Sequence, residues 1–98
     1  MTSTVQLSHP DSSKNGVIID RQKYEMVRDV IIKIIDTRGV ITFKELLSEA
    51  GKELTSQHFD GSPSWYCTWV KLDLEAKQII ERIQGSNPQK LRLRKVTF

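Results

Sequence analysis

Residues 69–82 read WVKLDLEAKQIIER and contain a change of pattern from helix to strand. Up to about Lys77 the apolar residues recur at helical spacing, and they cover rather more than half of a helical wheel. The chain then continues as Ile79-Ile80-Glu81-Arg82-Ile83, a short apolar run that is typical of a strand. This stretch therefore predicts a helix that is followed closely by a strand.

The residues that follow predict a β-hairpin. Gly85-Ser86-Asn87-Pro88 is a break typical of a turn of about four residues. Beyond it the sequence alternates, so Leu91, Leu93 and Lys95 are expected on one side of a last strand. The other side of that strand then carries three cations, Lys90, Arg92 and Arg94.

The residues that precede the quoted stretch predict how its helix begins and what comes before it. Ser62-Pro63 predicts the helix start, because serine is a favoured N-cap and proline is tolerated in the first turn. Residues 52–61 are predicted to form a polar loop of about ten residues. Thr42-Phe43-Lys44-Glu45 predicts a capping box, and Gly51 is expected to end that second helix after about two turns. Val40-Ile41 is long enough only for a stub of strand.

The first helix is expected to begin at Asp20 and to end before Gly39. Its apolar residues recur at helical spacing and are numerous enough to serve both its own core and a partner helix. Residues 1–16 are rich in Ser, Thr, Asn and Gly and show no period, so we expect a disordered tail there. The folded domain is then expected to span residues 17–98.

Length and composition describe one ordinary domain. Ninety-eight residues have room for one core, and 38% hydrophobic with 28% charged residues is typical of a globular protein. No apolar run approaches the roughly 18–20 residues of a membrane span, and the N-terminus lacks a signal-peptide pattern. We therefore expect a cytoplasmic protein without membrane contact. The single cysteine, Cys67, excludes an internal disulfide and fits a reducing compartment.

The quoted stretch carries a resemblance to bacterial winged helix-turn-helix proteins. Val70 and Leu74 match an apolar pair that closes the recognition helix of that family, and Ile79-Ile80-Glu81-Arg82 matches the first strand of its wing. Gln78 stands where the family usually has glycine. The resemblance implies an α+β, mostly helical fold with three helices and a small antiparallel β-hairpin wing. The chain also resembles small uncharacterised bacterial winged-helix proteins with a Val-Lys-Leu-Asp-Leu-Glu-Ala segment, for which no settled activity is implied.

The winged-helix fold serves DNA binding, RNA binding and protein–protein contact alike, so the resemblance does not decide the function. The chain after Glu81 carries cations and no Asp or Glu, and this asymmetry favours a nucleic-acid-binding protein, with double-stranded DNA as partner and transcriptional regulation as the expected role. The third helix has a polar strip from which Ser64, Thr68 and Lys71 could reach base edges or phosphates. The outward cations of the last strand, Lys90, Arg92 and Arg94, could hold phosphates along the backbone. The net charge of +3 is a mild bias in that direction.

The alternative is a winged-helix module for protein–protein contact or dimerisation without DNA binding. Two departures from the DNA-binding pattern favour it: the long loop over residues 52–61, and Trp65-Tyr66 at the start of the third helix. An exposed Trp65 with Tyr66 would form a partner surface, whereas Trp69 lies in the broad apolar arc and is expected in the core.

No enzyme is expected. Cys67, His58 and Asp60 are the only neighbouring residues that could form a nucleophile–base set or a metal site, and zinc would need a further ligand. Cys67 falls on the inner side of its helix, where a thiol packs well. No phosphate-binding glycine loop or catalytic signature is found, so we predict no catalytic residue, no metal and no cofactor.

Overall fold

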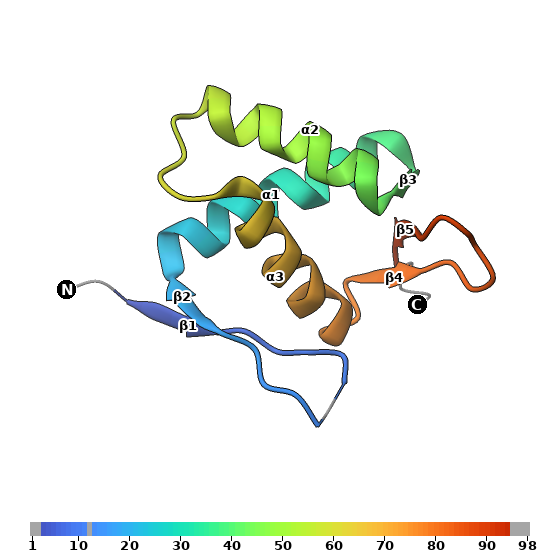
Figure 1. Cartoon of the computed structure of the whole chain (residues 1–98), viewed down its shortest axis with the longest axis horizontal. Coiled ribbons are helices and arrows are strands. Elements are labelled where there is room, and N and C mark those ends of the chain that lie inside the picture. The colour runs from blue at the N-terminus through green and yellow to red at the C-terminus, as the bar shows by residue number, and fades with distance from the viewer. Residues whose placement is uncertain (1–2, 12, 95–98) are drawn as a thin grey trace.

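The structure is a computed structural model that describes residues 3–11 and 13–94. It is an α+β fold with three helices and two small antiparallel sheets (Figure 1). In chain order the elements are β1 (Thr4–Gln6), β2 (Ile18–Asp20), α1 (Arg21–Arg38), β3 (Val40–Thr42), α2 (Phe43–Ser56), α3 (Pro63–Ala76), β4 (Ile80–Arg82) and β5 (Lys90–Leu93).

The ends of α1 and the start of α3 lie where the local signals predict them. The Asp20 side chain accepts a hydrogen bond from the Lys23 backbone N–H, which satisfies a donor of the first turn of α1. Gly39 ends the helix at a φ of 78°, and its N–H donates to the Ile35 carbonyl. Ser62 caps α3 through the Trp65 N–H, with a proline in the first turn.

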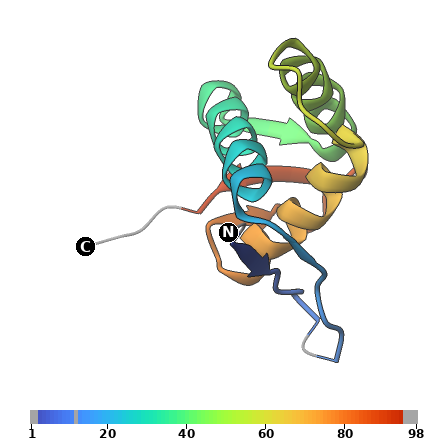
Figure 2. The ribbon, with the colours of Figure 1, turned by 90° about the vertical axis from the view of Figure 1, so that its left-hand side faces the viewer.

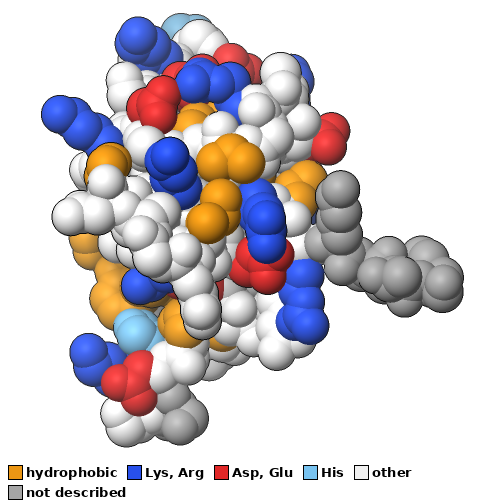
Figure 3. Space-filling model, turned by 90° about the vertical axis from the view of Figure 1, so that its right-hand side faces the viewer, with side chains coloured by type: hydrophobic (Ala, Val, Ile, Leu, Met, Phe, Trp, Pro, Cys, Tyr) orange, Lys and Arg blue, Asp and Glu red, His pale blue; other side chains and the backbone are white. Residues whose placement is uncertain are grey.

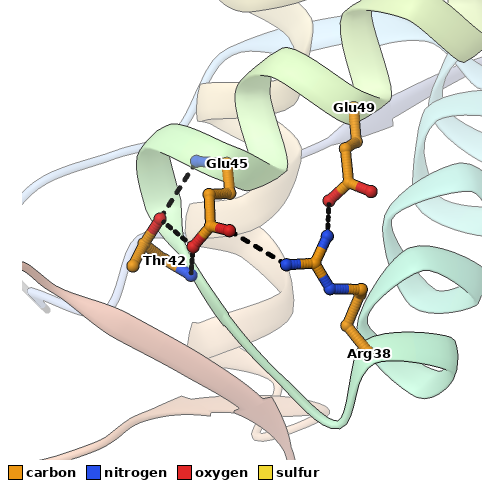
Figure 4. A network of polar contacts seen from close by, with 4 residues as sticks. All are labelled: Arg38, Thr42, Glu45 and Glu49. Atoms are coloured by element: carbon orange, nitrogen blue, oxygen red, sulfur yellow. Dashed lines mark hydrogen bonds and ion pairs between the residues drawn. The ribbon is translucent and has the colours of Figure 1, made fainter.

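The start of α2 carries the predicted capping box. The Thr42 hydroxyl accepts from the Glu45 N–H at 3.1 Å, and the Glu45 carboxylate accepts from the Thr42 N–H at 3.3 Å. Arg38, at the end of α1, donates to Glu45 at 2.9 Å and to Glu49 at 2.7 Å (Figure 4). The Thr42 hydrogen bonds, together with Arg38, lower the pKa of Glu45. These contacts join the two helices where the chain turns between them.

The helix α2 is longer than predicted, because Gly51 does not end it. The helix continues to Ser56, and the loop to α3 shrinks to residues 57–62. Leu46, Ala50 and Leu54 are all buried at spacings of four, so one apolar row runs past the glycine. Burial of Leu54 outweighs the cost of a glycine within a helix, about 1 kcal/mol.

The larger sheet has the strand order β3–β5–β4, and both pairings are antiparallel. It lies where α1 and α3 end and α2 begins, and the three helices pack against one another beside it (Figures 1 and 2). Ile41, Leu91 and Ile80 are buried on the side of the sheet that faces the core. The predicted hairpin of the last two strands is thus confirmed, whereas Lys95 lies outside the described residues.

The described part of the N-terminal segment is folded, so the prediction of a disordered tail over residues 1–16 is wrong. In the described part of residues 1–16, β1 pairs with β2, and Leu7 is buried with 2% of its surface exposed. Gly16 lies so close that an added Cβ would come within 2.2 Å of the Leu7 carbonyl oxygen. The pairing with residues 18–20 supplies backbone hydrogen bonds and a buried position that the composition of the segment alone does not reveal. The folded unit therefore begins before residue 17.

The described residues contain no helix that is both long and apolar enough to cross a membrane.

Candidate functional site

The outward side of α3 is where sequence reasoning placed both the DNA-reading residues and the partner surface. We call this side the α3 face and define it by Ser64, Trp65, Thr68, Trp69 and Leu72. Ser64 is exposed, Trp65 is 43% exposed, and the other three are half-buried. The Thr68 hydroxyl donates to the Ser64 carbonyl at 2.8 Å, so its only proton is used within the helix. The α3 face is therefore an uncharged surface of aromatic, aliphatic and hydroxyl side chains.

Lys71 does not lie on this surface, which corrects its prediction as a DNA contact. Only 3% of the residue is exposed. Its Nζ lies 3.1 Å from a Glu75 carboxylate oxygen and 4.6 Å from the centre of the Phe43 ring. Burial lowers the pKa of Lys71, and the neighbouring Glu75 opposes that shift. A side chain enclosed in this way between α3 and α2 cannot reach a base or a phosphate.

Glu75 is also enclosed, and it connects α3 to β4. The Arg82 guanidinium donates to both of its carboxylate oxygens, at 2.8 and 3.2 Å. This hydrogen bonding raises the pKa of Arg82. One acid on α3 thus balances two cations, Lys71 on the helix and Arg82 on β4. The second half of the predicted polar strip, Lys71 and Glu75, therefore forms a packed ion cluster with Arg82.

The three cations predicted for the last strand lie at the surface, whereas Lys71 is buried. Lys90, Arg92 and Arg94 are all exposed. Arg92 pairs with Glu81 on the neighbouring strand at 2.9 Å, and Arg94 donates to the Gln78 side chain. Figure 3 looks at this side of the molecule, where Lys and Arg side chains alternate with acidic and hydrophobic ones. The positive charge is distributed among acids and does not form one continuous basic surface with α3.

Aromatic rings gather around the start of α3. Trp65 packs edge-on against Tyr66 with ring centroids 4.9 Å apart, and Phe59 lies 5.1 Å from Tyr66. Trp69 continues the row, 6.3 Å from Trp65 and 6.5 Å from His9 of the N-terminal segment. Sequence reasoning identified Trp65 and Tyr66, but it missed Phe59 and His9, which reach the row only through the fold.

The residues considered for catalysis are not assembled into a reactive centre. Cys67 is buried in the core, whereas His58 and Asp60 are exposed in the loop before α3. No group of three His, Cys, Asp or Glu side chains that could hold a metal ion occurs in residues 3–11 and 13–94. Burial raises the pKa of the Cys67 thiol to about 11, and a protonated thiol is a poor nucleophile. The absence of enzymatic activity stays a prediction.

The Cys67 shift predicts a pH dependence of stability. A thiol whose folded pKa is raised from its ordinary value of 9.0 stabilises the fold fully below pH 9, and this contribution is lost as the pH rises through about 11. We expect the wild type to lose on the order of 2–3 kcal/mol more than Cys67→Ala over that range. Urea unfolding of both proteins at several alkaline pH values measures the difference. If the free energy of unfolding falls equally with pH in both proteins, the thiol does not contribute to the pH dependence.

Comparison with known proteins places this chain in one family. Residues 4–91 match a group described as a family of unknown function (DUF6958). The chain belongs to this family. The matched range of this DUF6958 protein runs from β1 into β5, so it includes the N-terminal strands as well as the helices. Neither the curated proteins nor the solved structures contain a match to it.

Proposed function

We propose that this chain is a winged-helix module that binds a protein partner through the α3 face. The winged-helix part of the proposal is supported by the order α1, β3, α2, α3, β4, β5 and by the placement of β5 between β3 and β4. The hairpin that follows α3 then corresponds to the wing. Because this fold serves several functions, the choice among them depends on the surface of α3.

The observation that carries the proposal is the lack of charge on the α3 face. A helix that reads DNA presents cations and amide or guanidinium donors to phosphates and base edges. Here the lysine of the helix is enclosed, and an exposed tryptophan occupies the start of the helix. The centres of protein–protein interfaces are poor in charge and rich in aromatic side chains. The α3 face has this composition.

Nucleic-acid binding is the second candidate, and the wing favours it. Lys90 is exposed and has no ion-pair partner within the described part of the chain, and Arg92 and Arg94 are exposed although paired. Together with Ser64 and Thr68, these cations could contact double-stranded DNA, as a transcriptional regulator would. Such binding would depend mainly on phosphates and would therefore be weak in sequence preference and sensitive to salt.

A photo-crosslinking amino acid at Thr68 separates the two candidates in living cells. The same group at Ser48, an exposed position on α2, is the matched control. We expect protein adducts of defined mass from position 68 and none from position 48, and Trp65→Ala should remove them because it deletes the exposed ring. Nucleic-acid adducts from position 68, or the same adducts from both positions, would contradict the proposal.

Titration with a generic DNA duplex tests the second candidate directly. If the wing holds phosphates, Arg92→Ala with Arg94→Ala should weaken binding to every sequence and reduce the dependence on salt by about two phosphate contacts. Under the lead proposal the amide signals of residues 64–72 and 90–94 stay unchanged when duplex is added at low salt. Salt-sensitive shifts in both segments would favour the DNA-binding candidate.

A further inference from the structure

A second surface lies between α1 and α2, away from the α3 face. The two helices enclose an open hollow of about 780 Å³. From α1 it is lined by the exposed Met26, the half-buried Ile34 and the buried Val30. None of the residues of the α3 face lines it. The side from α2 is polar and charged, with Glu49, Lys52 and Glu53 among its residues. The hollow is therefore a groove with apolar side chains along α1 and charged ones opposite them, and the interaction proposed for α3 leaves it open.

Two opposite charges stand on one edge of this groove. Asp29 and Lys33 are four residues apart on α1, so they lie one helical turn from each other on the same side. The Asp29 side chain is 68% exposed, and among residues 3–11 and 13–94 its one ion-pair partner is its neighbour Arg28, at 3.0 Å. Lys33 is exposed and makes no ion pair in the portion of the chain that the structure describes. An exposed pair between adjacent residues is worth little, so Asp29 can exchange its partner at low cost.

These features are self-complementary under a twofold rotation. When two α1 helices run antiparallel about a twofold axis level with Ile31, residues at equal distances on either side of that axis meet. Asp29 of one copy is then level with Lys33 of the other, and the contact occurs twice. Ile34 of the opposite copy lies two residues, about 3 Å along the helix, from the level of Met26, so these apolar side chains are close enough to pack together. A parallel arrangement would instead set Lys33 against Lys33.

We propose that the groove between α1 and α2 is occupied by α1 of a second copy of this chain, with the two helices antiparallel. The dimer buries the Met26 and Ile34 side chains and exchanges the local Arg28–Asp29 pair for two Asp29–Lys33 pairs between chains. Both α3 faces stay outside this contact, so the dimer presents two copies of the partner surface. The proposal does not depend on what binds α3.

Charge reversal on α1 tests the arrangement by sedimentation velocity over a dilution series. Asp29→Lys sets lysine against lysine in both contacts, and Lys33→Asp sets aspartate against aspartate. We expect each variant to dimerise at least about tenfold more weakly than the wild type, because like charges are brought together. An equimolar mixture of the two variants restores opposite charges in both contacts, and we expect the dimer to return as a heterodimer. Recovery on mixing also shows that both variants are folded.

Matched charge reversals elsewhere serve as controls. Lys44→Asp and Asp60→Lys change exposed residues outside the groove, and Trp65→Ala changes the α3 face; all three should leave the dimer intact. A monomeric wild type at every concentration overturns the proposal. It is also overturned if the α1 variants dimerise like the wild type, or if mixing them fails to restore the dimer. A dimer that Trp65→Ala dissociates and the α1 variants do not would assign self-association to α3 instead.

Discussion

Replacing Asp73 by alanine is expected to lower the free energy of unfolding by about 3–5 kcal/mol, because it removes a buried carboxylate that accepts three hydrogen bonds and leaves their donors without a partner. Asp73 is completely buried on α3. Its carboxylate accepts from the Ser8 N–H at 2.8 Å, from the Tyr24 hydroxyl at 2.6 Å and from the Lys77 ammonium at 2.9 Å. These donors come from the N-terminal segment, from α1 and from the end of α3. One side chain therefore joins three parts of the fold.

The decrease in the free energy of unfolding should be larger for variants that remove more of these hydrogen bonds. Tyr24→Phe deletes one hydroxyl donor and leaves the carboxylate paired with Ser8 and Lys77, so we expect about 1–2 kcal/mol. Asp36→Ala removes an exposed acid of α1 and should stay within about 0.5 kcal/mol of the wild type. Urea unfolding of the three variants measures the series. An effect of Asp73→Ala no larger than that of Asp36→Ala would show that the network does not hold the fold.

The second large effect is expected at Leu7, in the segment that composition alone describes as a tail. Leu7→Ala removes a side chain that packs in the core, which typically costs about 2–5 kcal/mol. A disordered tail would tolerate the same change without loss. The measurement is again urea unfolding, followed by tryptophan fluorescence, to which Trp65 and Trp69 both contribute; the Trp69 ring lies beside His9 of the N-terminal segment.

Ile18→Ala is the matched control for Leu7→Ala. Ile18 lies on β2 of the same hairpin, pairs with Gln6 of β1, and is 64% exposed. Its truncation removes a similar volume without opening a cavity, so we expect a change of less than about 1 kcal/mol. Equal small effects at both positions would show that the hairpin does not contribute to the stability of the core.

The candidate site was only partly predictable from sequence. Trp65 and Tyr66 are identifiable because bulky aromatic residues at a helix start are unusual for a DNA-reading helix. Ser64 and Thr68 were correctly placed on the outward side of α3. Lys71 was misplaced, because a helical wheel assigns it to the edge of the polar strip but does not show what covers that edge. Phe43 of α2 covers it together with Glu75, which Arg82 of β4 holds in place, and both Phe43 and Arg82 come from other elements.

The sequence by itself determined the features that depend on residues a few positions apart. Asp20 and Lys23 start α1, Thr42 and Glu45 start α2, and a glycine ends α1, because a cap needs only the adjacent turn of backbone. The hairpin of β4 and β5 follows from its turn and its alternation in the same way.

Tertiary structure alone decided the features that depend on residues far apart in the chain. The hydrogen bond from Ser8 to Asp73 spans 65 positions and fixes the N-terminal segment on α3. The run of α2 through Gly51 depends on a buried position for Leu54, which the packing of the helices provides. Local sequence patterns determine where helices and turns begin and end. The burial of a side chain depends instead on which other elements pack against it. The charge at the surface of α3 therefore depends on the tertiary structure, because α2 and β4 supply the residues that enclose Lys71 and Glu75.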